Sequence, residues 1–539
     1  MAVNYRPINR DQGTLMPVDM REWLPTDHLV WWILAAVEQM DTSAFTHRPA
    51  RRKTQHSRAG QPGYDPDMLL GLLIYAYAVG QRSSRGIERD CHIDVAYRVL
   101  CAQDVPDHTV IARFRSEHKA ALVDFFSQVL LLCARAGMVK VGAVALDGTK
   151  IAANASHSRS LKEGTLRKMA TALAAEQPPR PQGVEPGGQR VFTAADARAI
   201  ADEAICESVA ADQREDHEPA AHDNRRGPLD PGGSAGHSAL AAQVREALAQ
   251  IDDELEQSPS QDMQYSLNRL AAAQARYDRE LAAAKAMHER WAAKTAAGNV
   301  VGRGALKPLG QTLAVRNAWD RVLAAREAMA VKKAKQNPAR RNLTDMDSRV
   351  MRMGSGWGQC YNNQLVASTD HIILAAAASN ATSDVRQYQH MIAKTVAALD
   401  ALAAAGADRG RIGVVLADAG YSSTDNLAAD GPDRLIPSAA GQNVQRKTKS
   451  VVRQQFPDED ADLLTVMDYC LSTPGGTQSY RRRRWMIEPI NAHLKDRRGL
   501  RRFSMRGLDA VNSELHFAAA VTNLLRVFTV KGFGGLVTV

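Results

Sequence analysis

The chain has 539 residues, too many for one hydrophobic core, and this length predicts about three domains. Apolar residues make up 45% and charged residues 24% of the sequence, which excludes a wholly disordered protein. The formal charge is +9, and a concentrated excess of this kind favours a polyanionic partner. Residues 480–506 hold ten basic and two acidic residues, so most of the excess lies in one short window.

The cysteines and the N-terminus bear on the compartment. Six scattered cysteines form no CxxC pair, so neither a disulfide framework nor a zinc cluster is expected, and a reducing cytosol is the simplest setting. The first residues lack the pattern of a signal peptide, and no uninterrupted apolar run approaches the ~18 residues of a membrane span. We expect a cytoplasmic protein that does not contact a membrane.

Residues 1–138 are predicted to form an all-helical N-terminal domain. Pro66, preceded by an aspartate, begins one helix, and Asp94 begins another. A later short helix carries Arg113 and Arg115 on its polar faces, and we predict that both bind DNA. Three short helices with a basic face on the last resemble a helix-turn-helix motif, although any three-helix bundle produces a similar pattern.

Residues 157–339 differ in composition from the rest of the chain. The stretch 175–237 is rich in Pro, Gly, Asp and His and is predicted to be flexible. A long helix from about residue 260 follows, with one apolar stripe that repeats every seven residues: Leu270, Tyr277, Ala284 and Trp291. A second helix, about 311–335, is expected to pack against it through Leu313, Trp319 and Leu323. We therefore predict an antiparallel helical hairpin.

Two apolar runs each end in an aspartate. Residues 141–146 read as a buried strand that ends at Asp147, where Gly148 permits a tight turn. Residues 412–417 repeat this pattern and end at Asp418. Parallel strands that end in this way would place both carboxylates at one edge of a sheet. Taken alone, each aspartate could be an ordinary turn residue.

A third acid lies on a predicted helix, about 482–496. Arg484, Glu488 and Lys495 fall on one face of that helix, at i, i+4 and i+11. Three converging carboxylates need a counter-charge, and Mg²⁺ or Mn²⁺ suits a set of oxygen ligands. Two such ions could serve an in-line displacement at phosphorus. The alternative is that Glu488 only pairs with Arg484 one turn away.

The basic window is predicted to hold a phosphate backbone, although a solvated charge run is the alternative. Its candidate DNA-binding residues are Arg481, Arg482, Arg483, Arg484, Lys495, Arg497 and Arg498. Three residues of a preceding loop, Asp345, Asp347 and Arg349, form a network beside the site or only cap a strand, and the sequence does not decide between these.

Several motifs together resemble the DDE transposases of bacterial insertion sequences. Gly63–Pro66, Arg82–Arg85 and Pro106–Arg115 are similar to the helical N-terminal domain of one branch of that family. Leu146–Lys150, Asn342–Arg349, Cys360–Gln364 and Leu416–Tyr421 are similar to its catalytic core. The resemblance implies an α/β ribonuclease-H-like core, a mixed sheet with helices, formed by residues 139–156 and 340–530. The stretch 157–339 is then an α-helical insertion.

The resemblance also implies a function and a site. Asp147, Asp418 and Glu488 would be the catalytic, metal-binding triad, with Arg484 and Lys495 matching the signature around the glutamate. Tyr480 departs from that signature by one residue of spacing. The implied enzyme binds the terminal inverted repeats of its element as a homodimer or larger assembly on double-stranded DNA, then cleaves and joins strands with two Mg²⁺ or Mn²⁺ ions. The alternatives are a ribonuclease-H-fold nuclease that does not join strands, and a domesticated DNA-binding protein.

Overall fold

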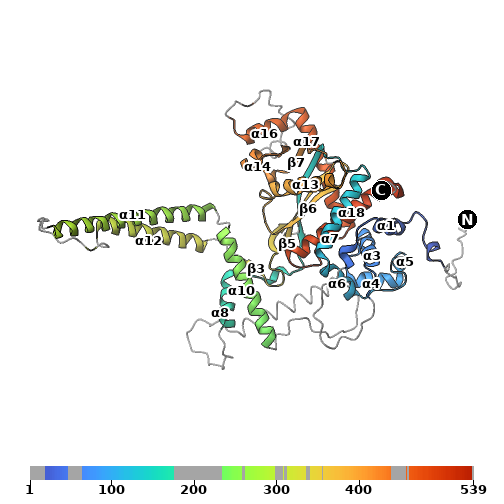
Figure 1. Ribbon diagram of the computed structural model, residues 1–539, viewed down its shortest axis with the longest axis horizontal. Coiled ribbons are helices and arrows are strands. Elements are labelled where there is room, and N and C mark those ends of the chain that lie inside the picture. The colour runs from blue at the N-terminus through green and yellow to red at the C-terminus, as the bar shows by residue number, and fades with distance from the viewer. Residues whose placement is uncertain are drawn as a thin grey trace, which may run out of the picture. The chain divides into compact units, whose positions relative to one another are not determined.

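The computed structural model describes residues 19–46, 63–174, 234–257, 261–297, 308, 312–335, 340–354, 356–408, 410–438, 457 and 461–536 (Figure 1). The chain divides into two compact units, Met1–His157 with Thr344–Val539, and Ser158–Leu343. The stretch predicted to be flexible lies outside the described residues, apart from residues 234–237. Among the described helices, none has the length and apolar character needed to cross a bilayer.

The first unit begins with a group of helices whose starts follow from capping residues. They are η1 (Met20–Glu22), α1 (Leu29–Glu38), α2 (Ser43–Thr46), α3 (Pro66–Val79), α4 (Ser84–Ile93), α5 (Val95–Leu100), α6 (His108–Glu117) and α7 (Lys119–Arg135). Asp65 accepts a hydrogen bond from the Asp67 amide at 2.8 Å, and Asp94 accepts one from Ala96 at 2.7 Å. These caps satisfy amides that a helix leaves free, and both predicted helix starts are confirmed.

A mixed six-stranded sheet forms the centre of the same unit. Its strands are β1 (Ala143–Ala152), β4 (Arg349–Met353), β5 (Gly356–Ser368), β6 (Ile373–Ser379), β7 (Val414–Ala417) and β8 (Asp433–Leu435). The order is β4-β5-β1-β7-β8, with β6 also paired to β5. Strands β1, β7 and β8 run parallel, whereas β5 is antiparallel to β1, β4 and β6.

The remaining elements of this unit follow the strands along the chain. They are α13 (Gln387–Ala404), η4 (Ala419–Tyr421), α14 (Thr424–Ala428), α16 (Leu463–Ser472), α17 (Pro474–Ala492), the π-helical turn η5 (His493–Arg497), α18 (Leu508–Lys531) and η6 (Gly532–Gly535). Helix α18 contacts both α7 and β6. Asn523 bonds both backbone groups of Ile373, at 2.8 and 2.9 Å, and Asn512 does the same for Ala378. The helix thereby satisfies backbone groups that an edge strand would otherwise expose.

A buried carboxylate joins the N-terminal helices to α18. The Glu514 side chain is fully buried and pairs with Arg82 at 2.7 Å. It also accepts hydrogen bonds from the backbone amides of Ser504 and Met505. Replacing Glu514 would leave all of these donors without this acceptor, so we expect the replacement to lower the free energy of unfolding.

The second unit is mainly helical. Its elements are β2 (Ser160–Lys162), α8 (Glu163–Ala174), α10 (Ser234–Gln257), α11 (Gln261–Ala296), α12 (Leu313–Lys335) and β3 (Arg340–Asn342). Helices α11 and α12 lie side by side as the predicted hairpin (Figure 1). Strands β2 and β3 pair in antiparallel register, from Ser160 opposite Asn342 to Lys162 opposite Arg340.

The contact residues of α12 differ from those predicted. Leu313 is 73% exposed and Leu323 45% exposed, so their assignment to the hairpin interface is wrong. Trp319 does meet Tyr277, with ring centroids 5.1 Å apart, but it stays partly exposed. The buried stripe consists of smaller side chains at spacings of three and four: Val315, Ala318, Val322 and Ala325. The prediction followed the largest apolar residues, whereas the interface uses smaller ones, which let the two helices approach closely.

Candidate active site

Asp147 and Asp418 occupy neighbouring positions at the carboxyl end of β7. In the parallel pairing of β1 with β7, Leu146 lies opposite Ala417, and the next residue on each strand is the aspartate. Adjacent strands lie about 4.8 Å apart, so the two backbones are close at this level. Asp418 also caps the turn η4 by accepting a hydrogen bond from the Gly420 amide at 2.9 Å. The structure thus brings the backbones of the two predicted site aspartates side by side, with Asp418 directly beyond the end of β7.

Strand β1 does not end at Asp147, which corrects the predicted turn at Gly148. The strand continues to Ala152, and Gly148 pairs with Gln364 of β5. A Cβ at Gly148 would lie 2.7 Å from Asp384 Oδ1 and 2.7 Å from Gln364 Nε2. The glycine is therefore needed for the close approach of these side chains and not for a turn.

Helix α17 supplies two partners to the Asp147 carboxylate. Arg483 Nη1 lies 3.2 Å from Asp147 Oδ1, and Asn491 Nδ2 donates to Oδ2 at 2.8 Å. Burial raises the pKa of Asp147 to about 6, an effect that Arg483 opposes and Asp418 reinforces. Burial likewise raises the pKa of Asp418, again opposed by Arg483. Asn491 was missed by the sequence prediction, although its spacing of eight residues from Arg483 places both on one helix face.

Tyr480 belongs to the same cluster. Burial raises the pKa of Tyr480, and Arg483, three residues further along the helix, opposes that rise. The arginine that faces the carboxylates is thus Arg483 and not the predicted Arg484, whose side chain is 84% exposed.

Glu488 lies at the margin of this cluster. Its side chain is about half exposed and accepts a charged hydrogen bond from Arg484 Nε at 3.2 Å. Among the described residues, no hydrogen bond or ion pair joins Glu488 to either aspartate. It lies one helical turn before Asn491, the residue of the same helix that bonds Asp147.

A proline removes one hydrogen bond of the helix next to Glu488, and a residue of the sheet replaces it. Pro489 stands inside α17 and has no amide hydrogen, so the carbonyl of Trp485 loses its helical donor. His371, in the turn between β5 and β6, bonds this carbonyl through Nε2 at 2.9 Å. The two rings also meet edge to face, with centroids 5.8 Å apart. The sheet therefore holds α17 at the turn that carries the glutamate.

Two of the predicted DNA-binding arginines donate hydrogen bonds within the fold. Arg115 is only 7% exposed and donates to the Arg82 carbonyl at 3.0 Å and to Ser84 Oγ. Arg498 donates to the carbonyl of Ala78 at the end of α3, and burial lowers its pKa to about 10. The prediction that Arg115 contacts DNA is corrected, because its guanidinium is buried and bonds the fold itself, whereas Arg498 is half-buried and its DNA contact stays a prediction.

The other predicted basic residues remain accessible to differing degrees. Those with exposed side chains are Arg113, Arg481, Arg482, Arg484 and Arg497. Lys495 is half-buried, and burial lowers its pKa while Asp147 raises it. Exposed arginines next to half-buried carboxylates give this side of the site a positive charge that favours the approach of a polyanion.

The aspartates of the preceding loop cap a helix. Asp345 Oδ1 accepts the hydroxyl of Tyr361 at 2.6 Å and the amide of Gly507 at 3.2 Å. Asp347 Oδ2 accepts the amide of Leu508 at 2.8 Å. Both therefore anchor the N-terminus of α18, so they cap a helix and not a strand, which neither alternative from the sequence had foreseen.

The carboxylate cluster fits a hard divalent cation. Its donors are oxygens, and burial with a neighbouring like charge disfavours two ionised aspartates without a counter-charge. Oδ1 of Asn491 is buried beside Asp147 without a hydrogen-bond partner among the described residues, which adds one more oxygen in need of a donor or cation. Arg483 is the only cation joined directly to Asp147 in the described part of the chain.

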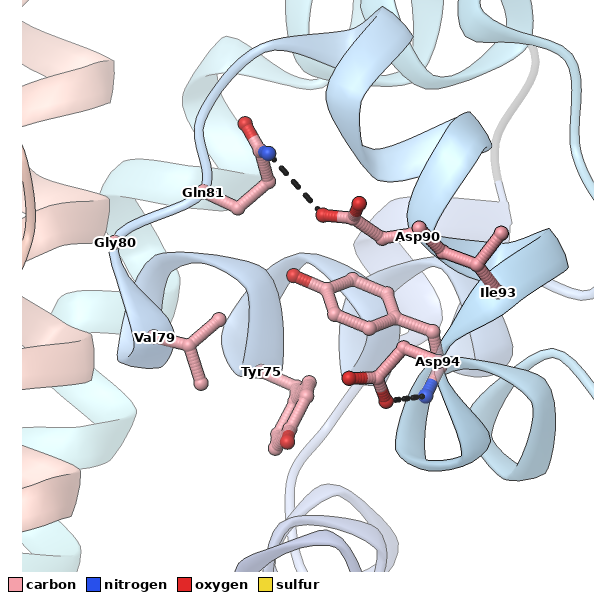
Figure 2. A pocket seen from close by; sticks show the side chains of 8 residues that line it. Tyr75, Val79, Gly80, Gln81, Asp90, Ile93 and Asp94 are labelled. Carbon is pink, nitrogen blue, oxygen red and sulfur yellow. Dashed lines mark hydrogen bonds between the residues drawn. The ribbon is translucent and has the colours of Figure 1, made fainter. Parts of the chain in front are cut away.

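Two other features of the N-terminal helices lie apart from these residues. Glu88, Asp107 and His108 bring one ligand atom each within 4.8 Å of one another, but Asp107 already caps α6. A cavity of about 470 Å³ is lined by Tyr75, Val79, Gly80, Gln81, Asp90, Ile93, Asp94 and Tyr97 (Figure 2). Gln81 Nε2 donates to Asp90 at 3.1 Å across this cavity, as Figure 2 shows. None of the predicted site residues lines it.

Two families of known proteins match the chain. A family described as Transposase domain (DUF772) matches residues 18–117, and one described as Transposase DDE domain matches residues 338–524. Together they cover more than half of the chain, including Asp418 and Glu488, whereas Asp147 lies between them. No curated protein and no solved structure matches it.

Proposed function

Because the chain belongs to the DDE transposases of insertion-sequence type, we propose that it binds the terminal inverted repeats of its own element and cleaves and joins DNA. Family membership makes it a DNA-binding, nucleic-acid-cleaving enzyme. The observation that carries the proposed site is the register of β1 and β7, which sets Asp147 beside Asp418 under the basic helix α17.

We assign the sheet and its helices to a ribonuclease-H-like core. The order β4-β5-β1-β7-β8, with β5 antiparallel and β1, β7 and β8 parallel, supports this assignment. In such a mixed sheet, ligands bind beyond the carboxyl ends of the parallel strands. Asp418 lies at that position and Asp147 is level with it.

Asp147, Asp418 and Glu488 are the residues that would hold the metal ions. Mg²⁺ or Mn²⁺, as a pair of ions, would activate the attacking oxygen and stabilise the leaving oxygen. Arg483 compensates the charge of the aspartates, and Asn491 orients the Asp147 carboxylate. Glu488 would exchange its contact with Arg484 for the site, which frees Arg484 for a phosphate.

The reaction has two displacements at phosphorus. Water attacks the phosphodiester at the element end, the P–O3′ bond breaks, and a free 3′ hydroxyl remains. That hydroxyl then attacks a phosphodiester of the target, and a new P–O bond replaces the one that breaks. No covalent bond to the protein forms. The exposed side chains of Arg481, Arg482 and Arg497 would hold the DNA backbone, and Arg113 would contact it from the N-terminal helices.

A strand-transfer assay with end DNA and Mg²⁺ tests this function. Asp147→Ala and Asp418→Ala should each abolish cleavage and joining, whereas Asp425→Ala, an exposed aspartate of α14, should retain both. Joining by either site variant would show that the site is wrong. Cleavage without joining by the wild type would favour a nuclease, and DNA binding without cleavage would favour a domesticated binding protein. A homodimer on end DNA would appear in the mass of the complex.

A salt titration tests the DNA contacts. The affinity for end DNA should fall steeply as the salt concentration rises, because bound arginines release counterions from the phosphates. Arg481→Gln with Arg482→Gln should make that dependence shallower, while Arg115→Gln should leave its slope unchanged because Arg115 is buried. An affinity that is indifferent to salt would contradict the phosphate contacts.

A further inference from the structure

Asp384 lies beside the two site aspartates, although the sequence did not single it out. It belongs to the loop between β6 and α13. A Cβ at Gly148 would lie 2.7 Å from Asp384 Oδ1, and a Cβ at Gly420 would lie 3.5 Å from its Oδ2. Gly148 directly follows Asp147, and Gly420 lies two residues after Asp418. The carboxylate of Asp384 therefore lies between the backbone segments that carry the two aspartates.

One oxygen of Asp384 is held by three donors. Oδ1 accepts from Asn362 Nδ2 at 2.6 Å, Gln364 Nε2 at 2.8 Å and Lys150 Nζ at 3.3 Å. Gln364 is fixed in turn, because its other side-chain atom accepts the buried hydroxyl of Tyr421. These donors come from β1 and β5, so the sheet sets the position and orientation of the carboxylate.

The other oxygen of Asp384 is available. Among the described residues no hydrogen bond reaches Oδ2, which is turned toward Gly420 and Asp418. Asp384 also acts electrostatically on Asp418, since it adds to the rise that burial causes in the pKa of Asp418. An acceptor that the sheet orients so firmly, and leaves unpaired beside a second carboxylate, has the geometry of a cation ligand.

The charges of the cluster point the same way. Two cations pair directly with the three carboxylates Asp147, Asp384 and Asp418, namely Arg483 with Asp147 and Lys150 with Asp384, while Lys495 acts on Asp147 without a direct contact. One of the three negative charges is therefore without a direct ion-pair partner among the described residues, and partial burial makes this costly. A divalent cation would remove it.

We propose that Asp384 is a fourth carboxylate of the cation site, with Oδ2 on the side of Asp418. This inference rests on the proposed function, because it takes Asp147 and Asp418 to be metal ligands. Asn362 and Gln364 then act as positioning residues that fix the orientation of Asp384, and Lys150 partly neutralises its negative charge. The chain thus has an acid for the site outside the triad.

Binding of Mn²⁺ to the full chain, without DNA, tests the proposal. The titration follows free Mn²⁺ by electron paramagnetic resonance and compares the wild type with Asp384→Asn, Asp147→Asn and Asp425→Asn. Asp384→Asn should weaken Mn²⁺ binding by ~10- to 100-fold, the usual effect of losing a group that serves a metal site. Asp425→Asn should match the wild type, since that side chain is exposed on α14. Melting curves confirm that each variant is folded.

The outcomes separate this inference from the proposed function. Unchanged Mn²⁺ affinity in Asp147→Asn would overturn the metal site as a whole. A loss in Asp147→Asn with wild-type affinity in Asp384→Asn would overturn the role of Asp384 and leave the function intact. The double variant Lys150→Met, Asp384→Asn decides whether charge alone matters. It should stay weak if Asp384 is a ligand, and recovery to the wild-type affinity would show that Asp384 only neutralises Lys150.

Discussion

Replacing Asp147 with asparagine should stabilise the metal-free protein at neutral pH. Burial raises the pKa of the Asp147 carboxyl from 3.8 to about 6, even though Arg483 opposes the rise. At about 1.4 kcal/mol per pKa unit, holding this group ionised costs the folded state about 3 kcal/mol. The asparagine keeps an acceptor for Arg483 and carries no charge, so it escapes this cost.

The pH dependence gives the prediction its sign. Because the folded pKa lies above the unfolded one, the cost is absent below about pH 4 and grows as the pH rises. It is complete above about pH 6. The free energy of unfolding of Asp147→Asn, minus that of the wild type, should therefore increase by about 3 kcal/mol from pH 4 to pH 7.

Urea unfolding in the presence of a chelator, at both pH values, measures this difference. The exposed control Asp425→Asn should show no such change between the two pH values. Added Mn²⁺ should stabilise the wild type and not Asp147→Asn, because only the wild type keeps the full ligand set. A difference that stays constant with pH, or that decreases toward pH 7, would refute the electrostatic reasoning.

Three other substitutions probe the same unit. Arg483→Gln removes the charge that lowers the pKa of Asp147, so the acidic limb of the cleavage rate against pH should move to higher pH, and an unmoved limb would contradict the contact. Gly148→Ala places a methyl group 2.7 Å from Asp384 Oδ1, and we expect the free energy of unfolding in urea to fall by ~1–3 kcal/mol, together with slower cleavage. Glu514→Ala removes the buried ion-pair partner of Arg82, and thermal unfolding should show a free energy of unfolding lower by ~3–5 kcal/mol. A loss no larger than that caused by replacing an exposed glutamate would disprove the structural role of Glu514.

Local signals in the sequence predicted much of the fold. Asp65 and Asp94 mark helix starts because their side chains cap amides two residues away, which requires no knowledge of the tertiary structure. The alignment of Asp147 with Asp418 was also predictable, since two apolar runs of similar form each ended in an aspartate. Each cap and each apolar run with its aspartate is a local pattern, although the two runs lie 418 − 147 = 271 residues apart.

The parts that sequence reasoning missed depend on distant partners. By its spacing, Arg115 belongs to a basic helix face. In the structure its guanidinium is buried, because it donates to the Arg82 carbonyl and to Ser84 Oγ at the start of α4. Asp384 lies beside Gly148 and accepts a hydrogen bond from Lys150, although more than 200 residues of chain separate it from both. A single sequence contains no signal of such a contact. Asn491 is the exception, because its helical spacing from Arg483 was visible.

The pairing of β2 with β3 brings together the two ends of the segment between Lys162 and Arg340. Lys162 and Arg340 lie opposite each other in antiparallel strands, so the chain leaves and returns at points about 5 Å apart. A two-residue glycine-containing turn could join these positions and convert the neck into an ordinary hairpin. Evolution could thus lengthen, shorten or exchange the segment between them while the strands that carry the aspartates keep their register.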